Sequence, residues 1–345
     1  MRYIVEPLRS VGIQIIKKLT DKRPKTAKTC LILGHKSIPM QDLLAYITWT
    51  ASPEIINLGP LTLRWYGLLF AAGFLAGLYI VKAMFKAENA PEEWLDRIFI
   101  YMVVGAVVGA RLGHVFFYDW DYYSQHLTEI PMVWKGGLAS HGGAIGIILA
   151  LWIFSRFESK RSVLWVLDKV VVPTALAGCF IRLGNLMNSE IVGKPTDVAW
   201  GFKFPRNETN LWEKCSACIE RAGQGCVEVA EMASGKFCVA LSEVPVRHPV
   251  QLYESISYLL TFFLLYWVYW KTDAKNRLGR MFGLFLLLVL GVIRFGLEYF
   301  KTSQGGFESA VNAGLSTGQL LSIPFMLVGL FFLLRPAKES PAAKS

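Results

Sequence analysis

The chain has 345 residues, of which 53% are hydrophobic, and its mean hydropathy is +0.39. This is more apolar surface than a soluble domain can bury, so the composition excludes an ordinary soluble protein and indicates an integral membrane protein. The formal net charge of +10 does not indicate nucleic-acid binding, because beyond residue 39 the basic residues mostly fall in short segments between apolar stretches.

Residues 1–39 form a basic N-terminal extension. They contain nine lysine and arginine residues and two acidic residues, Glu6 and Asp21. The formal charge of the extension is therefore nine minus two, which is +7 of the chain's +10. Such a segment resists transfer across a membrane, and it lacks both the apolar core and the cleavage site of a signal peptide. Because Met40 stands just upstream of the first apolar stretch, we interpret the extension as a segment that is not translated.

Seven apolar stretches approach the length of about 17–25 residues that a membrane-spanning helix needs. They are Leu61–Val81, Ile98–Tyr118, His141–Phe157, Val170–Met187, Val250–Trp270, Met281–Phe300 and Ser316–Leu334. The sequence therefore predicts an all-α polytopic membrane protein with seven transmembrane helices. Its membrane domain covers residues 40–335, and residues 336–345 form a short tail.

Lysine and arginine residues between the stretches predict the orientation, since short positively charged loops stay cytoplasmic. The segments after the third and fifth stretches carry four basic residues each: Arg156, Lys160, Arg161 and Lys169, then Lys271, Lys275, Arg277 and Arg280. The segments after the second and sixth stretches offer only Lys135 and Lys301. We therefore expect the N-terminal end of the first helix outside and the C-terminal tail inside.

The segment over residues 188–247 is the longest between two stretches, and we expect it to form an extracytoplasmic loop domain. It holds four of the six cysteines in the pattern C-x2-C-x7-C-x11-C: Cys215, Cys218, Cys226 and Cys238. In an oxidising compartment, four cysteines predict two disulfides with three possible pairings. Zinc binding and free thiols are the alternatives. Zinc is less favoured because the second pair lacks the C-x2-C spacing and no nearby histidine completes a common pattern.

The strongly polar residues of the predicted helices lie at one depth, toward the outer side. The helices that run outward carry Arg111, Arg182, Arg294 and Glu298 near their outer ends. The helices that run inward begin with “LRWYG”, “SHGG” and “RHPVQLYE”. Because ionisable residues inside a membrane are costly and are usually functional, their gathering predicts a functional cavity.

The charged candidates also have structural explanations. Arg294 and Glu298 are four residues apart, so they could lie on one helix face and neutralise each other. Arg111 could extend its guanidinium to the outer membrane interface instead of binding a ligand. These explanations stay open at the level of the sequence.

The uncharged candidates and the histidine have alternatives as well. Asn185 and Ser189 could form hydrogen bonds between helices. His141 could be a hydrogen-bonded interfacial histidine, while Gly142 and Gly143 beside it could permit close helix approach. Neither explanation requires a ligand.

A cavity with two or three arginines and no carboxylate cluster favours an anion. The guanidinium group matches the geometry of phosphate and keeps its charge when it is desolvated. A phosphate at this depth, open to the outer leaflet, fits a phospholipid head group. The sequence has no P-loop and no H-E-x-x-H, G-x-S-x-G or Asp-rich motif, so it indicates no metal site, nucleotide or other cofactor.

Several motifs resemble those of bacterial prolipoprotein diacylglyceryl transferases. “IRLGNLMNSEIVGKPT” is similar to the signature of that family, and “LRWYGLLF”, “SHGGAIG”, “RHPVQLYES” and “STGQLLSIP” resemble other family stretches in the expected order. The resemblance extends from about Ile55 to Leu334 and implies seven helices in the bacterial cytoplasmic (inner) membrane, with the N-terminus outside. It also implies transfer of the diacylglyceryl group of phosphatidylglycerol to the lipobox cysteine of a prolipoprotein, with release of glycerol 1-phosphate.

The resemblance further implies roles for individual residues. Arg182 would bind the phosphate of phosphatidylglycerol, and four residues would shape its surroundings: Asn185, Asn188, Glu190 and Gly193. His141 would act as base or proton relay for the thiol, and Arg294 would stabilise the leaving phosphate with help from Tyr66. We add further candidates for substrate binding, namely Gly142, Gly143, Glu298 and Arg111. Membrane lipids are the remaining expected partners.

Three positions depart from the family pattern. Ile181 stands in place of a glycine, Leu290 in place of a tyrosine and Lys301 in place of an arginine. Leu290 cannot form a hydrogen bond through its side chain, which excludes a tyrosine function at that position. The alternative from another class is a transporter or flippase for an anionic lipid or solute, which would also use an arginine-lined cavity. Transporter sites lie near the bilayer midplane, whereas these polar groups lie toward one leaflet, which favours an interfacial enzyme.

Overall fold

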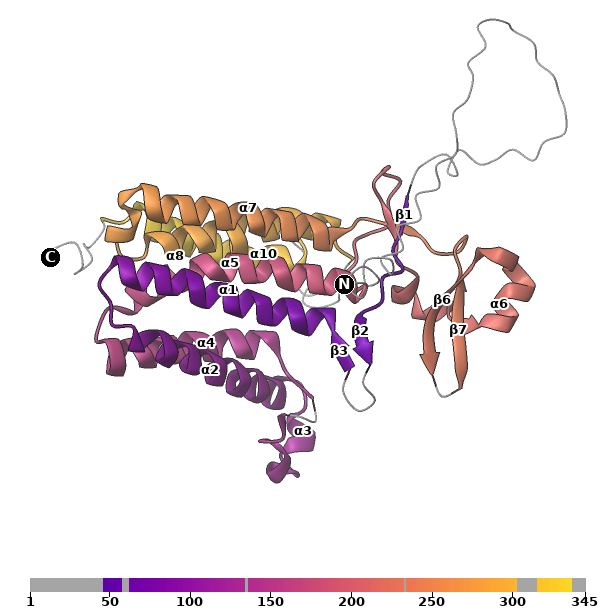
Figure 1. The fold of residues 1–345 in the computed structure, drawn as a ribbon, viewed down its shortest axis with the longest axis horizontal. Helices are drawn as coiled ribbons and strands as arrows, with labels where there is room; N and C mark the ends of the chain where they lie inside the picture. Colours follow the sequence, from indigo (N-terminus) through magenta and orange to yellow (C-terminus); the bar gives the residue numbers. More distant parts are fainter. Residues whose placement is uncertain (1–45, 58–61, 134–135, 233, 303–314, 337–345) are drawn as a thin grey trace, which may run out of the picture. The chain divides into compact units, whose positions relative to one another are not determined.

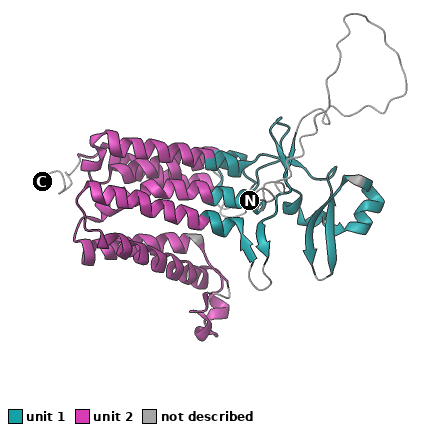
Figure 2. Ribbon diagram, viewed as in Figure 1, with its two compact units in different colours: residues 1–69, 181–255, 297–316 teal, residues 70–180, 256–296, 317–345 magenta. Residues whose placement is uncertain are grey.

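Most of the described chain is helical, as the apolar stretches predict. The structure is a computed structural model that describes residues 46–57, 62–133, 136–232, 234–302 and 315–336. The predictions for the extension over residues 1–39 and for nearly all of the C-terminal tail fall outside these residues. The chain divides into two units, which are described separately below (Figure 2). Unit 1 consists of residues 1–69, 181–255 and 297–316, and unit 2 of residues 70–180, 256–296 and 317–345.

Six helices of the described chain are long and apolar enough to cross a membrane (Figure 1). They are α1 (Trp65–Ala87), α2 (Glu93–Phe117), α4 (Ser140–Ile153) with wider turns to Ser159, α5 (Val163–Met187), α8 (Arg280–Phe285) continuing to Phe300, and α10 (Thr317–Leu334). The prediction of a helical, multi-pass membrane protein is thereby supported. Helix α7 (Val250–Lys271) has 22 residues, but its aromatic and polar residues keep it outside this group, so the seventh span stays a prediction.

Helix α5 begins earlier than the sequence indicates. The fourth apolar stretch predicts a start at Val170, but the helix starts at Val163 and contains the charged residues Asp168 and Lys169. Both are buried: the Lys169 Nζ lies 2.7 Å from the Glu88 Oε1, and the Asp168 carboxylate accepts two backbone N–H groups at the start of α8 at 2.6 and 2.8 Å. Buried charges persist when they are paired in this way. Two of the four basic residues used to place this segment inside are therefore not in a loop, since Arg156 also lies in the helical turns that end at Ser159.

Helices α2 and α4 pack closely through glycine. Gly105, Gly109 and Gly113 of α2 face Gly142 and Gly146 of α4. A Cβ atom on Gly109 would lie 2.4 Å from the Gly142 carbonyl oxygen, and one on Gly146 would lie 2.1 Å from that of Gly105. Small residues allow such approach between membrane helices. The geometry thus gives Gly142 the packing function that the sequence left open.

Unit 1 contains β-structure that the all-α prediction lacks. Its strands are β1 (Ile47–Thr48), β2 (Glu54–Asn57), β3 (Thr62–Arg64), β4 (Phe202–Lys203), β5 (Glu213–Lys214), β6 (Cys226–Met232), β7 (Gly235–Ala240) and β8 (Val246–Arg247). They form sheets in the orders β1-β4-β8, with β1 parallel to β4, then β2-β3, and finally β5-β7-β6. Most of these strands are too short for an alternating pattern to stand out in the sequence. The all-α prediction is therefore incomplete for this unit.

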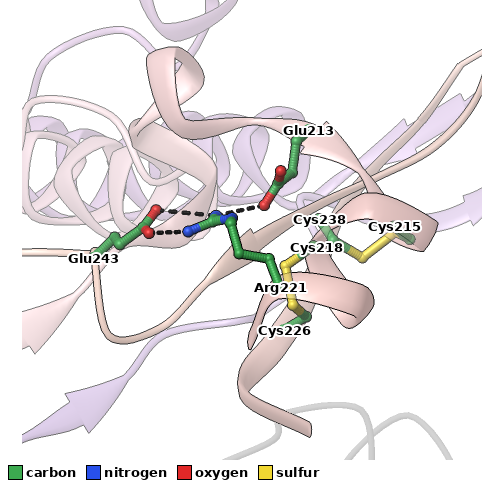
Figure 3. The surroundings of a disulfide bond; sticks show 7 residues. All are labelled: Glu213, Cys215, Cys218, Arg221, Cys226, Cys238 and Glu243. Atoms are coloured by element: carbon green, nitrogen blue, oxygen red, sulfur yellow. Dashed lines mark hydrogen bonds and ion pairs between the residues drawn. A yellow bond between two sulfur atoms is a disulfide. The ribbon is translucent and has the colours of Figure 1, made fainter. Parts of the chain in front are cut away.

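Two disulfides close the segment between α5 and α7 (Figure 3). Cys215 bonds to Cys238, and Cys218 bonds to Cys226. The structure thus has disulfides rather than a zinc site or free thiols, and it has one of the three possible pairings. Both bonds start from the short helix α6 (Cys215–Ala222) and tie it to β7 and β6. Such cross-links typically contribute about 2–5 kcal/mol in small domains. They cross-link a segment whose buried apolar clusters are small, such as the one formed by Val229, Val239 and Val244.

A surface ion-pair cluster lies beside the disulfides. Arg221 of α6 contacts the carboxylates of both Glu213 and Glu243 (Figure 3). Hydrogen bonds to Glu243 and Glu213 raise the pKa of the Arg221 guanidinium. The bond between Arg221 and Glu243 also lowers the pKa of the Glu243 carboxyl. Ion pairs at a surface contribute little to stability. The disulfides are therefore the stronger constraint on this segment.

Candidate functional site

Arg182, near the end of α5, is held at two edges of its guanidinium. The Nε atom lies 2.8 Å from the Glu254 Oε2, and the Nη1 atom donates to the Asn185 Oδ1 at 3.2 Å. Glu254 belongs to the first turns of α7, and its side chain is only 1% exposed. The Arg182 side chain, by contrast, is 22% exposed. The guanidinium is therefore oriented by the protein and still partly accessible to a ligand.

The carboxylate of Glu254 also binds a second cation. The Lys301 Nζ lies 2.8 Å from the Glu254 Oε1, while Arg182 occupies the other oxygen. The same Nζ lies 3.6 Å from the Glu298 Oε2. Glu298, predicted from the sequence either as a ligand residue or as the partner of Arg294, thus contacts Lys301. One buried carboxylate orients two cations, because each of its oxygens accepts one of them.

The two predicted asparagines hold the carboxylate of Glu190. The Asn185 amide nitrogen lies 3.3 Å from the Glu190 Oε2, and that of Asn188 lies 3.1 Å from the Oε1. The Gln251 amide donates to the Glu190 backbone carbonyl at 2.6 Å. Since Asn185 also accepts from Arg182, hydrogen bonds connect the guanidinium to Glu190 through a single side chain.

Gly193 lies where three segments of unit 1 meet. Its N–H donates to the His248 carbonyl at 3.0 Å, and it pairs with Lys301 in an isolated antiparallel bridge. A Cβ atom here would lie 2.5 Å from the His248 oxygen and 2.7 Å from a methyl of Val250. Only glycine fits without displacing these segments. The residue thereby brings the turn after α5 next to the segment that carries Lys301.

Tyr66, the second residue of α1, packs on the same part of α5 within unit 1. A Cβ atom on Gly184 would lie 2.8 Å from the Cδ2 of the Tyr66 ring and 3.2 Å from its Cα. The glycine of the “RLG” motif therefore makes room for this tyrosine. Tyr66 is half-buried, and the glycine that it packs against, Gly184, is two residues after Arg182 on α5.

Arg294, in unit 2, follows a π-helical segment. Residues 286–293 form wider turns than an α-helix, and Arg294 begins the short helix α9 (Arg294–Leu297). Such turns are frequent at functional sites. Its Nε is buried and has no hydrogen-bond partner among the described residues. A buried donor without an acceptor is unfavourable, so an anion bound here would relieve that cost.

His141 occupies the first turn of α4 in unit 2, and its ring is exposed. The ring centroid lies 5.6 Å from those of Phe117 and Tyr118, at the end of α2. An exposed imidazole can be reached by a substrate group and form a hydrogen bond with it. Gly143, two residues on, makes only ordinary contacts with α2, since a Cβ atom there would lie 3.4 Å from the Ala106 oxygen.

Comparison with known proteins agrees with these motifs. The family model described as prolipoprotein diacylglyceryl transferase matches residues 53–335. The chain belongs to this family. It is 42% identical to the phosphatidylglycerol–prolipoprotein diacylglyceryl transferase of Chloroherpeton thalassium, over 88% of this chain and 99% of the relative. The proteins of the same name from Tolumonas auensis and Porphyromonas gingivalis are 44% and 42% identical, over 84% and 86% of this chain and 98% and 97% of their own.

In this family member, unit 1 contains the predicted catalytic residue Tyr66 and most of the residues predicted to bind substrate: Arg182, Asn185, Asn188, Glu190, Gly193 and Glu298. The other candidates, in unit 2, are His141, Gly142, Gly143, Arg294 and Arg111. Arg111 differs from the rest, because it is 2% exposed and its guanidinium donates to backbone carbonyls. Among the residues predicted to bind substrate, Arg111 is therefore the one that the structure supports least.

Two residues of the transferase network are missing from the sequence-based candidates. Gln251 and Glu254 lie in the motif “RHPVQLYES”, yet neither is singled out as a site residue. Their spacing of three places both on one face at the start of a helix, next to each other. A carboxylate and an amide at that position of an apolar helix need partners, which is the signal that could have identified them.

Proposed function

We propose that the chain transfers the diacylglyceryl group of phosphatidylglycerol to the lipobox cysteine thiol of prolipoproteins and releases glycerol 1-phosphate. The relatives above are named for phosphatidylglycerol and prolipoprotein as substrates. The observation that carries the proposal is the Arg182 guanidinium, which is fixed by buried Glu254 and yet partly open to a ligand. A planar, pre-oriented cation of this kind suits a phosphodiester.

In this proposal the phosphate binds at the open part of Arg182. Lys301 adds a second positive charge through their common partner Glu254. Asn185, Asn188 and Glu190 keep the end of α5 in place, because Asn185 forms hydrogen bonds with both Arg182 and Glu190. Tyr66 and Gly193 shape the surroundings, while Gly142 and Gly143 support α4 rather than contact the lipid.

The chemical step exchanges one bond for another at the glyceryl carbon. The cysteine thiol gives its proton to His141, and the thiolate attacks the diacylglyceryl CH2 group bonded to the phosphate oxygen. A C–S bond forms, the C–O bond breaks, and its electron pair leaves with glycerol 1-phosphate. The unpaired Nε of Arg294 stabilises the charge that develops on the leaving group. His141 then releases the proton to solvent.

We also propose that the segment between α5 and α7 lies outside the cytoplasm and that α7 is the seventh membrane span. The two disulfides support this, because such bonds persist in oxidising compartments. The 22 residues of α7 are long enough to cross a bilayer. The N-terminal end of α1 is then outside and the C-terminal tail is inside the bacterial cytoplasmic membrane.

Single cysteines at exposed positions test this orientation. In right-side-out vesicles, a membrane-impermeant maleimide is expected to label Ala199→Cys, which precedes the disulfide segment. It should not label Asp273→Cys, just after α7, until detergent is added. The native disulfides do not react, and the parent chain provides the background control. Labelling of both positions, or of Asp273→Cys alone, would refute the orientation.

The activity itself is tested with purified protein, phosphatidylglycerol and a lipobox peptide. We expect mass spectrometry to detect one added diacylglyceryl group on the peptide and an equal amount of glycerol 1-phosphate. A peptide with serine in place of the cysteine is the control and should gain no mass. Movement of lipid between leaflets without any gain in peptide mass would support the transporter alternative.

A further inference from the structure

Every nitrogen of the Arg111 guanidinium donates to a backbone carbonyl of the segment between α2 and α4, whose described part we call the α2–α4 loop (residues 118–133 and 136–139). The Nε atom donates to Ile130 at 2.8 Å and the Nη2 atom to Glu129 at 2.8 Å. The Nη1 atom donates to Gly136 at 2.6 Å and to Gly137 at 3.3 Å. These bonds leave the guanidinium poorly placed to bind a phosphate.

Further contacts press the loop against the end of α2. The ring of Tyr123 lies under the guanidinium, with its centroid 4.8 Å from the Cζ. The His114 Nε2 lies 2.7 Å from the Asp119 Oδ2. At Gly137, where φ is +70°, a Cβ atom would lie 2.4 Å from the His114 ring and 2.9 Å from the Arg111 Nη1. The loop therefore has little space in which to shift while Arg111 is present.

The α2–α4 loop ends at the start of the helix that carries His141. The Ala139 N–H donates to the Ala110 carbonyl at 2.9 Å, directly beside Arg111 in sequence. His141 follows two residues later, and a Cβ atom on Gly142 would lie 2.7 Å from the Gly113 Cα. The place at which α4 begins is thus set by the same end of α2 that holds the loop.

We propose that Arg111 is a positioning residue for His141. By binding the carbonyls of the α2–α4 loop, it fixes the first turn of α4 and hence the ring that accepts the thiol proton. This inference rests on the proposed function of His141. A lysine cannot replace the arginine, because one ammonium group cannot reach carbonyls arranged around a planar fork.

The first test compares Arg111→Lys with the parent chain. Turnover should fall by up to about 10²-fold, as a small misplacement of a reacting group can cause. The KM for phosphatidylglycerol should stay unchanged, and amide hydrogen exchange in the α2–α4 loop should rise. Arg97→Lys, on the same helix but paired with Glu158, is the matched control and should change none of these. A raised KM with normal exchange would instead make Arg111 a phosphate ligand and overturn the inference.

The second test is a double-mutant cycle with His141→Gln. If Arg111 acts through His141, adding Arg111→Lys to His141→Gln should reduce turnover by no more than about twofold further. If His141→Gln is impaired and Arg111→Lys lowers its turnover by the same factor as in the parent chain, the inference is overturned while the proposed function of His141 stands. Full turnover in His141→Gln by itself would remove the base function and the inference with it. Should Arg111→Lys fold poorly, Tyr123→Leu is the milder variant and should shift turnover and loop exchange in the same direction.

Discussion

Replacing Arg182 with lysine is expected to lower transfer by about 10²–10³-fold, although the positive charge is kept. Lysine has one nitrogen in place of three, so it cannot bind Glu254 and Asn185 and present a donor to the phosphate at once. The measurement is kcat/KM with phosphatidylglycerol and a lipobox peptide, together with lipid binding. Both should decrease, because the residue acts in binding as well as in the transition state.

Two further variants serve as comparisons for Arg182→Lys. Glu254→Gln should weaken transfer in the same direction, because it removes the charge that orients Arg182 and Lys301. Arg221→Lys, in the disulfide segment, changes an arginine outside this network and should leave turnover near that of the parent. Normal transfer by Arg182→Lys would rule out the phosphate function, whatever the result for Glu254→Gln.

The substitution His141→Gln is expected to lower turnover by about 10²–10⁴-fold, the usual range for general acid–base catalysis. Glutamine keeps similar size and some hydrogen bonding but cannot accept the thiol proton. Affinity for phosphatidylglycerol should barely change, since Arg182 and Arg294 are intact. Turnover per folded molecule and lipid affinity are measured on the same preparation.

A purely structural histidine would behave differently. The variant would then unfold at a lower temperature, while the folded fraction would work at the normal rate. Phe117 contacts the His141 ring without any proposed chemistry, so Phe117→Leu is the matched control for lost packing. Near-normal turnover in His141→Gln would leave thiol deprotonation to another group or to water.

The sequence by itself determined the helical membrane class, because length and apolar composition decide whether a helix can cross a bilayer. Its motifs also indicated the family and the end of α5 with the turn that follows, which carry Arg182, Asn185 and Glu190. It indicated the number of disulfides, since four cysteines in one segment are enough for two. Each of these inferences depends on residues that lie close together in the chain.

Only the tertiary structure decided which groups meet across long separations. The partner of Lys169 is Glu88, which directly follows α1, and both α2 and α4 lie between the two residues in the chain. Nothing in the sequence therefore indicates that these two charges form a pair. Arg182 and Lys301 share Glu254 because α5, α7 and the segment after α9 approach one another in unit 1. The cysteine pairing was equally open, since it depends on how β6 and β7 place their residues against α6.

Arg111 is the clearest example of a residue whose partners the sequence does not reveal. In the sequence it resembles the other outer arginines, because its type and depth are the same. The structure instead gives its guanidinium the carbonyls of Glu129, Ile130 and Gly136 as acceptors. Every residue has a backbone carbonyl, so such acceptors leave no trace in the pattern of side chains. The sequence therefore determined which residues are polar inside the helices, and the fold determined whether a ligand or the chain itself satisfies them.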